Sequence, residues 1–500
     1  MTGSTQRSGY LLPAIAGATA AAGILTYLYR NEAICSTGKT DQKIARVGGD
    51  VPFFGDLFTA LARLDTVQDF YADTFEKTGN ATFVFKIPFS PNNYVFNNPE
   101  ILEFVLKTHF SVFDKGTRSY DLMYDLLGNG IFNVDGEAWR TQRKLAANIF
   151  NVKNFKDHVD SVFVDQELAF SRAVELHIEA SREFDVADLF YRLSFDTFAQ
   201  IAFGVNMNSM LSHECIDIMK ALDAVQKRIA HRFIDAFWRT TEYITGESKV
   251  HKREIQLIRD FVQAIIQKNR VSGVSENDLL SLLMKIDDQL GKVPSDDELI
   301  YYVLNFLIAG RESTAASLGW SVLLLSKYPR VLDSLLKEIN STSNGERPTY
   351  EQIKNGMPYA KAVMRETMRL YPPVPLNIKQ ANTDITLPDG TFVPKGASVS
   401  WSVYAMGRTE EIWGPDAKEY RPERWLEMNK QPSPYNYPVF QAGPRVCLGQ
   451  QMAELQVVYM LVQFVRNFKF EVVDPDSVTY TYSLTLRMKN GLKVRCQPRI

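Results

Sequence analysis

A short loop near the C-terminal end of the chain, 440–449, carries the residue with the most distinctive chemistry, Cys447. The loop reads FQAGPRVCLG. A thiolate in a tight loop can be an axial ligand of a haem iron, where it donates electron density that favours cleavage of an O–O bond. Its neighbours suit that role, since they include an aromatic cover, two glycines that let a flat macrocycle approach, and a cation for a propionate: Phe440, Gly443, Gly449 and Arg445. The alternative is a small buried cysteine in an ordinary turn, but the fixed spacing of five residue types favours the metal ligand.

A predicted helix over residues 295–327 is the second candidate for chemistry. Ser295 and Glu298 form a capping box at its start, and Pro329 follows its end. About 33 residues at a rise of 1.5 Å give roughly 50 Å, enough to cross a whole domain. Much of the segment is apolar on every face, so we expect a buried helix.

The centre of this helix, AGREST at 309–314, is polar where its surroundings are apolar. Ala309 is small and leaves room over a flat cofactor. Glu312 and Ser313 can relay protons to a reaction centre, and Thr314 follows directly behind them. The alternative is that the hydroxyls bond only to the helix backbone.

Two further motifs are weak evidence for a function by themselves and count only together with the others. Trp139 and Arg143 share one face of a predicted helix over 135–150, where an indole N–H and a guanidinium can together hold a carboxylate. The alternative is an ordinary amphipathic helix. Glu366 and Arg369 lie three residues apart in a predicted helix over 359–371, a spacing that by itself gives only a weak ion pair.

The order of these motifs, with Pro-Glu-Arg-Trp at 422–425, resembles that of the cytochrome P450 monooxygenases from about residue 47 to the C-terminus. The resemblance implies a mainly α fold with a small β region, and Cys447 as the protein ligand of haem b. It implies propionate binding by Trp139, Arg143 and Arg445, and oxygen activation at the acid–alcohol pair. Arg424 would complete a buried structural triad with the Glu366 and Arg369 side chains. One departure is that the alcohol position, usually Thr, is Ser313 here, which leaves Ser313 and Thr314 as alternatives for the relay.

The same resemblance implies partners. The chain carries no flavin-binding or nicotinamide-binding sequence, so electrons would come from NADPH through a separate reductase. The other partners would be O₂, a lipophilic substrate and a membrane. Near-neutral net charge, −2 in 500 residues, argues against nucleic acid.

Three segments resemble the fatty-acid ω-hydroxylase branch of the family: DLLGNGIFNVDGEAWRTQRKLA, LPDGTFVPKG and YSLTLRMKNGL. They imply medium- or long-chain fatty acids as substrates. Apolar residues expected to line the pocket are Phe132, Phe306, Ala309, Val374, Leu376 and Leu484. A cation among Lys227, Arg228, Arg232 and Arg239 could hold the carboxylate. Alternatives are an alkane, sterol or xenobiotic hydroxylase, a haem-thiolate isomerase or dehydratase, and a haem-binding sensor.

The N-terminal segment 10–29 is uncharged, mostly apolar and long enough to span a hydrocarbon core. Basic residues follow it, so we expect a single-pass anchor (residues 1–35) in the endoplasmic reticulum membrane. A hinge over 36–55 and a cytosolic catalytic domain over 56–500 would follow. The alternatives are a cleaved signal peptide and an Ala/Gly-rich tail. Four scattered cysteines do not form a disulfide framework.

The remaining patterns predict the elements that must position these residues. A strand pair is expected over 82–87 and 93–96, and an apolar, turn-rich loop over the pocket at 110–132. Helices are expected at 192–204, 220–244 and 453–468, and a terminal hairpin at 482–494 that turns at Asn490-Gly491.

Overall fold

The computed structural model describes residues 19, 22–23, 44–46, 51–150, 153–212, 216–272, 278–289 and 295–499. Almost all of the predicted anchor over 10–29, and much of the hinge over 36–55, lie outside these residues. Among the residues that are described, no helix is both long enough and apolar enough to cross a membrane.

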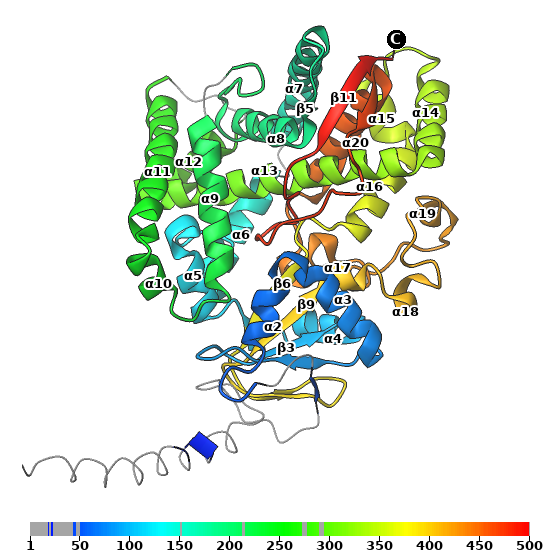
Figure 1. Cartoon of the computed structure of the whole chain (residues 1–500). Helices are drawn as coiled ribbons and strands as arrows, with labels where there is room; N and C mark the ends of the chain where they lie inside the picture. Colours follow the sequence, from blue (N-terminus) through cyan, green and yellow to red (C-terminus); the bar gives the residue numbers. More distant parts are fainter. Residues whose placement is uncertain are drawn as a thin grey trace, which may run out of the picture.

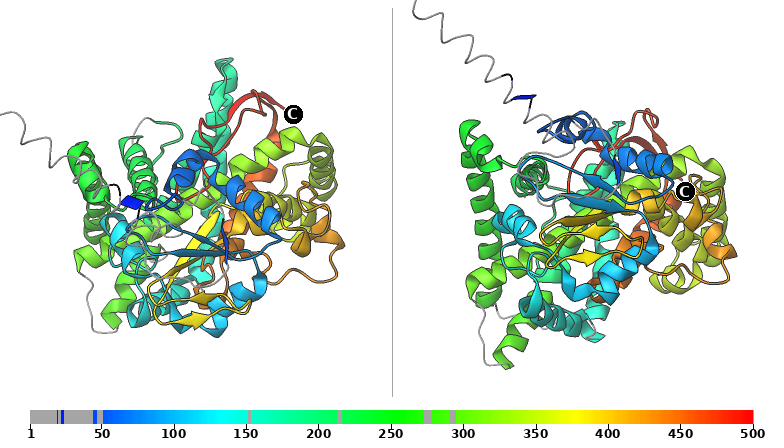
Figure 2. Two further views of the ribbon diagram at one scale, coloured as in Figure 1. Left: turned by 60° about the horizontal axis from the view of Figure 1, so that its bottom comes forward. Right: turned by 90° about the horizontal axis from the view of Figure 1, so that it is seen from below.

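Helices form most of the described body (Figures 1 and 2). The longest helices belong to the central part of the chain. The helices are α2 (Leu57–Ala62), α3 (Val67–Thr78), α4 (Pro99–Glu103), α5 (Thr117–Leu127), α6 (Gly136–Phe150), α7 (Lys153–Glu179), α8 (Val186–Phe203), α9 (Ile216–Arg232), α10 (Trp238–Ile244), α11 (Glu247–Ser272), α12 (Leu279–Gln289), α13 (Asp296–Lys327), α14 (Pro329–Ser343), α15 (Tyr350–Gly356), α16 (Pro358–Leu370), α17 (Val403–Met406), α18 (Glu410–Trp413), α19 (Arg424–Glu427) and α20 (Gln450–Asn467).

Three small sheets complete the described part of the fold, in agreement with the mainly α architecture predicted from the resemblance. The strands are β1 (Ala45–Arg46), β2 (Phe83–Phe85), β3 (Asn93–Phe96), β4 (Phe113–Asp114), β5 (Phe184–Asp185), β6 (Leu376–Ala381), β7 (Ile385–Thr386), β8 (Phe392–Val393), β9 (Ser398–Ser402), β10 (Phe468–Val472) and β11 (Lys493–Pro498). The largest sheet has the order β1-β2-β3-β9-β6-β4, and the others are β10-β11-β5 and β7-β8. The largest sheet lies at the bottom of Figure 1, whereas β5 and β11 lie at the top, beside α7 and α20. The predicted pairing of β2 with β3 is confirmed, with Phe83 opposite Val95 in an antiparallel ladder.

Helix α13 crosses the whole helical part of the molecule (Figure 1). Its start is the predicted capping box, in which the Ser295 hydroxyl accepts from the Glu298 N–H at 3.3 Å. The Glu298 carboxylate in turn accepts from the Ser295 N–H at 2.9 Å. The helix packs along α8 and also contacts α11, α16 and α20. Burial on nearly all faces explains why its apolar residues show no amphipathic stripe.

Two segments fold differently from the sequence prediction. The predicted loop over 110–132 contains helix α5, because Ser119, Leu122 and Leu126 share one buried face. The predicted helix over 220–244 is broken into α9 and α10. The chain turns back between them, and the Arg232 guanidinium donates to the Glu242 carboxylate at 2.7 Å. That buried ion pair joins the two shorter helices.

The predicted hairpin over 482–494 is also wrong. Strand β11 begins only at Lys493 and pairs with β10 on one side and β5 on the other. The preceding backbone finds other partners: the Trp320 indole donates to the Leu486 carbonyl at 2.8 Å, and the Leu486 N–H donates to the Pro373 carbonyl at 2.9 Å. Residues 487–489 pair with the chain before them: the Thr481 N–H donates to the Arg487 carbonyl at 2.9 Å and the Lys489 N–H donates to the Thr479 carbonyl at 2.8 Å. The antiparallel bridge therefore joins Tyr480 and Met488 and does not cross the predicted turn at Asn490-Gly491.

Candidate active site

The Cys447 loop is a tight turn that ends directly at the start of α20. The Cys447 N–H donates to the Phe440 carbonyl at 2.8 Å, which closes the loop. Gly443 has φ +65°, and a Cβ atom there would collide with the backbone carbonyl of Leu106. Gly449 is the N-cap residue of α20. The loop is therefore pressed against the helical segment Phe104–Thr108 by a contact that only glycine allows.

The Cys447 side chain is accessible even though protein surrounds it. It is exposed, whereas burial of its surroundings raises the pKa of the thiol by desolvation. The Gly449 N–H bonds to the sulfur and the Arg143 charge attracts the thiolate, and both oppose that shift. A sulfur that is accessible within a mostly desolvated setting, with a backbone N–H aimed at it, fits a thiolate ligand of a flat enclosed group.

Trp139 and Arg143 of α6 lie beside this loop. Trp139 is buried, and the Arg445 guanidinium carbon lies 4.5 Å from the centre of its ring. Arg445 donates to the Val134 carbonyl at 2.9 Å and to the Asp135 carboxylate at 2.5 Å. Its Nε is buried with no hydrogen-bond acceptor among the described residues. An unmatched guanidinium donor next to an indole and a second arginine fits a ligand with carboxylate groups, such as haem.

Two lysines that the sequence analysis missed extend this cationic cluster. Burial, then the neighbouring Arg445 charge, lower the pKa of Lys115 to about 8. Lys379 is buried and donates to the Phe113 carbonyl at 3.2 Å; its pKa is held well below the usual value, first by burial and then by Lys115 and Arg445. The cations Lys115, Lys379 and Arg445 have few carboxylates near them, so the cluster favours binding of an anionic ligand. In the sequence, the signal that could have indicated Lys379 is a lysine within the short strand LNIKQA.

The centre of α13 contains a partly accessible stretch. Ala309, Gly310 and Ser313 are half-buried in a helix that is otherwise almost entirely buried. The Ser313 hydroxyl donates to the Ala309 carbonyl at 2.8 Å. Thr314, by contrast, is buried. Of the two alcohols proposed for the relay, Ser313 is the one whose side chain is accessible.

Glu312 belongs to a buried polar network rather than to open solvent. It pairs with Arg311, and it accepts from the Gln226 amide at 3.3 Å and from the Thr485 hydroxyl at 3.4 Å. Arg311 also pairs with Asp223 at 2.7 Å. The network joins α9 and α13 to the segment before β11, and it holds the Glu312 carboxylate in a fixed position next to Ser313.

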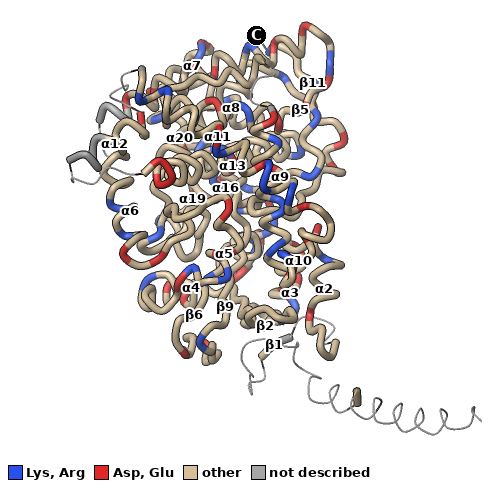
Figure 3. Tube along the Cα trace, turned by 90° about the vertical axis from the view of Figure 1, so that its left-hand side faces the viewer, with Lys and Arg blue, Asp and Glu red and all other residues tan. Residues whose placement is uncertain are grey.

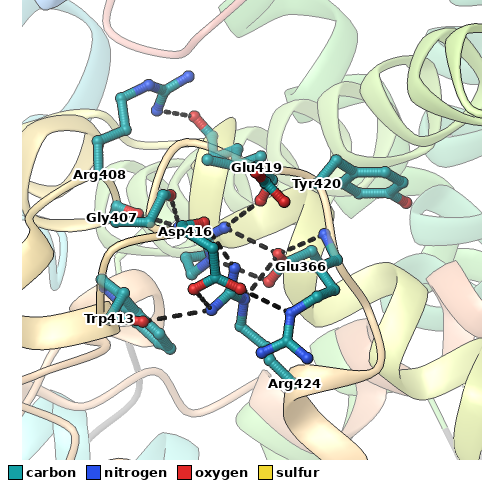
Figure 4. Close-up of polar contacts among 12 residues, drawn as sticks. Glu366, Gly407, Arg408, Trp413, Asp416, Glu419, Tyr420 and Arg424 are labelled. Atoms are coloured by element: carbon teal, nitrogen blue, oxygen red, sulfur yellow. Dashed lines mark hydrogen bonds and ion pairs between the residues drawn. The ribbon is translucent and has the colours of Figure 1, made fainter.

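Glu366, Arg369 and Arg424 converge on one fully buried cluster, shown in Figure 4. The Glu366 carboxylate accepts from Arg369 at 2.8 and 2.9 Å, from Arg424 at 2.9 Å and from the Trp425 indole at 2.9 Å. Arg369 also donates to the backbone carbonyls of Gly407, Ala417 and Glu419. The cluster thus ties α16 and α19 to the irregular chain between β9 and the Cys447 loop.

An open cleft lies next to the cationic cluster, and Lys115 belongs to both. Leu376 and Leu484, two of the residues expected in a substrate pocket, are among its lining residues. The other predicted pocket residues are not among its lining: Phe132 and Val374 are exposed, Phe306 is buried, and Ala309 belongs to the partly accessible stretch of α13. The inner part of the cleft adjoins the Cys447 loop, because Asn377 in its wall accepts from the Gln441 amide at 2.9 Å.

Comparisons with known proteins agree with this geometry. Residues 47–494 match the family described as Cytochrome P450. Cytochrome P450 704C1 of Pinus taeda is 35% identical over 483 residues, which cover 90% of this chain and 92% of that protein. Cytochrome P450 94A2 of Vicia sativa is 35% identical over 472 residues, 90% of each chain. Cytochrome P450 86B1 of Arabidopsis thaliana is 35% identical over 446 residues, 83% of this chain and 79% of that protein. Because the match covers the Cys447 loop and nearly the whole described body, the chain belongs to the cytochrome P450 family of haem-thiolate monooxygenases.

Proposed function

We propose that the protein is a fatty-acid ω-hydroxylase. The observation that carries the proposal is the cleft beside the Cys447 loop. Its walls are largely apolar, its charged lining residues in the described chain are the cations Lys115 and Arg118, and it has no acidic lining residue. Such a cleft suits an amphipathic anion with a long hydrocarbon chain. The sequence segments that resemble the ω-hydroxylase branch support the same substrate class.

A haem b held by Cys447 supplies the activation of O₂ and the insertion of one oxygen atom into a C–H bond. Overall, substrate, O₂, NADPH and a proton give the alcohol, water and NADP⁺, with electrons delivered through a separate reductase. The protein's own residues do the rest. Trp139, Arg143 and Arg445 would hold the propionates, and Phe440 and Gly449 would complete the ligand loop. Ser313, with Glu312 behind it, moves protons to the reaction centre.

Attack at the chain end requires confinement by the pocket. A primary C–H bond is stronger than the secondary bonds beside it, so intrinsic reactivity favours subterminal positions. The pocket must therefore present only the methyl group to the reaction centre. Apolar burial contributes about 0.8 kcal/mol per CH₂, so affinity should rise with chain length until the pocket is full.

The test is product analysis by mass spectrometry for a series of medium- and long-chain acids, with reductase and NADPH. We expect ω-hydroxy acids as main products. Mainly subterminal alcohols as products would refute the confinement of the chain end by the pocket. Turnover of alkanes, sterols or xenobiotics but not of fatty acids would show that the substrate belongs to one of those classes. Turnover of a hydroperoxide without NADPH would identify an isomerase or dehydratase. A protein that forms no reduced CO complex with reductase and NADPH would be a sensor.

We further propose that residues 1–35 anchor the protein in the endoplasmic reticulum membrane, with the catalytic domain in the cytosol. Support comes from the uncharged segment 10–29 and the basic residues that follow it. Over the described chain, acidic and basic residues are interspersed on the face seen in Figure 3. That mixture agrees with a partner set of membrane, reductase and small lipophilic molecules rather than nucleic acid.

A further inference from the structure

The cleft is bounded by elements distant in sequence: α3, α5, the end of α9, β6 and the segment around Leu484. Most of its polar lining is neutral. Its two cations differ in their surroundings. Lys115 lies in the cluster around Arg445 and Asp135, on the side of the Cys447 loop. Arg118 lies one helical turn further along the chain, against the end of α9.

The Arg118 guanidinium has hydrogen-bond donors that are not used by the described residues. Its Nη2 donates to the Phe233 carbonyl at 3.3 Å, and among the described residues no carboxylate forms an ion pair with it. Asp121 and Asp235 act on it only at longer range. A guanidinium carries five N–H donors and stays charged in proteins. Arg118 therefore presents unused donors at a site from which water is partly excluded.

The arginines that the sequence suggested for a substrate carboxylate are already engaged. Arg228 pairs with Glu247 at 2.9 Å and with Glu254 at 2.7 Å. Arg232 pairs with Glu242 and Asp125, and Arg239 pairs with Asp121 at 2.5 Å. These three residues and the exposed Lys227 are also absent from the described lining of the cleft.

We infer that Arg118 binds the carboxylate of a long-chain acid in this cleft, with the hydrocarbon passing Leu376 and Leu484 toward the Cys447 loop. The inference rests on the proposed function and names the positioning residue for its substrate. A carboxylate that leaves water needs a charged, hydrogen-bonding partner, and Arg118 is the unpaired guanidinium of this cleft. The Asn377–Gln441 contact shows that the wall beyond Leu376 reaches the ligand loop. An acid held at Arg118 would extend its methyl end inward.

The experiment titrates the haem-loaded, full-length protein with dodecanoic acid and with methyl dodecanoate, following the substrate-induced change in the haem spectrum. Arg118→Gln should weaken binding of the acid about tenfold or more, because a hydrogen bond to a charged group is lost. Binding of the uncharged ester should stay within about twofold. Arg118→Lys should restore part of the affinity for the acid. Arg118→Glu should lose the acid and gain affinity for dodecyltrimethylammonium.

Arg239→Gln is the matched control, since it removes a charge from the same region but one that Asp121 already pairs. It should leave both affinities unchanged. If Arg118→Gln weakens acid and ester equally, its role is only structural and the inference fails. If Arg118→Gln shows no reduced CO band, the test is made on the wild-type protein. Increasing the salt concentration should then weaken binding of the acid and leave binding of the ester unchanged, and any other result contradicts the inference. If the wild-type protein neither binds nor hydroxylates fatty acids, the proposed function fails together with the inference. If the wild-type protein hydroxylates fatty acids and Arg118→Gln binds the acid as tightly as the wild type does, the inference about Arg118 fails but the proposed function stands.

Discussion

The Ser313 hydroxyl donates to the Ala309 carbonyl one helical turn earlier, at 2.8 Å, on the face of α13 that remains partly accessible. Thr314, the next residue, is buried at 2% exposure. A hydroxyl-to-backbone bond of this kind satisfies the Ser313 donor within the helix and often bends a helix slightly. Position along the helix thus separates two adjacent alcohols that the sequence presents as equivalent.

Ser313→Ala should uncouple oxygen activation from product formation. Without the hydroxyl, proton delivery loses its last protein donor, so NADPH should still be consumed while several-fold more of it ends as peroxide. The measurement compares NADPH, peroxide and product in one reconstituted assay. Thr314→Ala is the control and should stay close to wild type. The reverse pattern would move the relay to Thr314.

Cys447→Ser should abolish the red-shifted absorption band of the reduced CO complex, because that band requires a thiolate ligand. Cys496→Ser removes the other described free cysteine, on β11, and should leave the band intact. The spectra are recorded on dithionite-reduced protein. A normal band in the Cys447 variant would exclude Cys447 as the iron ligand.

Glu366→Gln should destabilise the fold strongly. It would leave Arg369 and Arg424 charged and buried without their shared carboxylate, and breaking a buried pair in this way costs about 3–5 kcal/mol. The readout is denaturant unfolding together with the haem content of the purified protein. Glu175→Gln, which removes a surface partner of Arg172, should cost less than about 1 kcal/mol. Equal effects of the two changes would contradict a structural role for the buried cluster.

Asp196 on α8 should make stability depend on pH. Burial raises the pKa of Asp196 to about 6, and its Oδ1 has no hydrogen-bond donor among the described residues. Between about pH 4 and pH 6 the folded state then binds more protons than the unfolded state, so this group lowers stability as pH rises. The loss is at most about 3 kcal/mol.

Asp196→Asn should remove that contribution. Unfolding free energies of both proteins, measured from pH 4 to pH 7, should diverge as pH rises, with the variant gaining relative to wild type. Other carboxylates titrate in the same window, so only the difference between the two curves is diagnostic. Parallel curves would show that Asp196 titrates as an ordinary solvated carboxyl.

Deleting residues 1–33 should release the protein from membranes and preserve haem binding. The uncharged segment 10–29 motivates the change. Carbonate-washed membranes should retain the full-length protein and lose the shortened one, with the reduced CO band of each compared in parallel. Full-length protein that carbonate removes would rule out an integral anchor, whereas partial retention of the shortened form would indicate a second surface contact.

Local sequence patterns were enough to predict the family, the position of the cysteine loop and several of the long helices. Those inferences depend on local chemistry and spacing: a cysteine between glycines, the capping box at Ser295, and apolar runs of helical length. The boundaries of α6, α13 and α16 agree with the predictions to within one residue. The signals that mark them are local: the capping box of α13, the proline at the start of α16, and the buried faces of all three helices.

Contacts between side chains depend on the three-dimensional fold. It converts the weak Glu366–Arg369 spacing into a buried cluster by adding Arg424 from a distant segment. It also breaks the predicted helix at 220–244, replaces the terminal hairpin, and engages the suggested arginines in ion pairs. Lys115 and Arg118 emerge as the cations of the cleft for the same reason. Ion pairing and burial depend on contacts between residues far apart in the chain, and no local pattern encodes them.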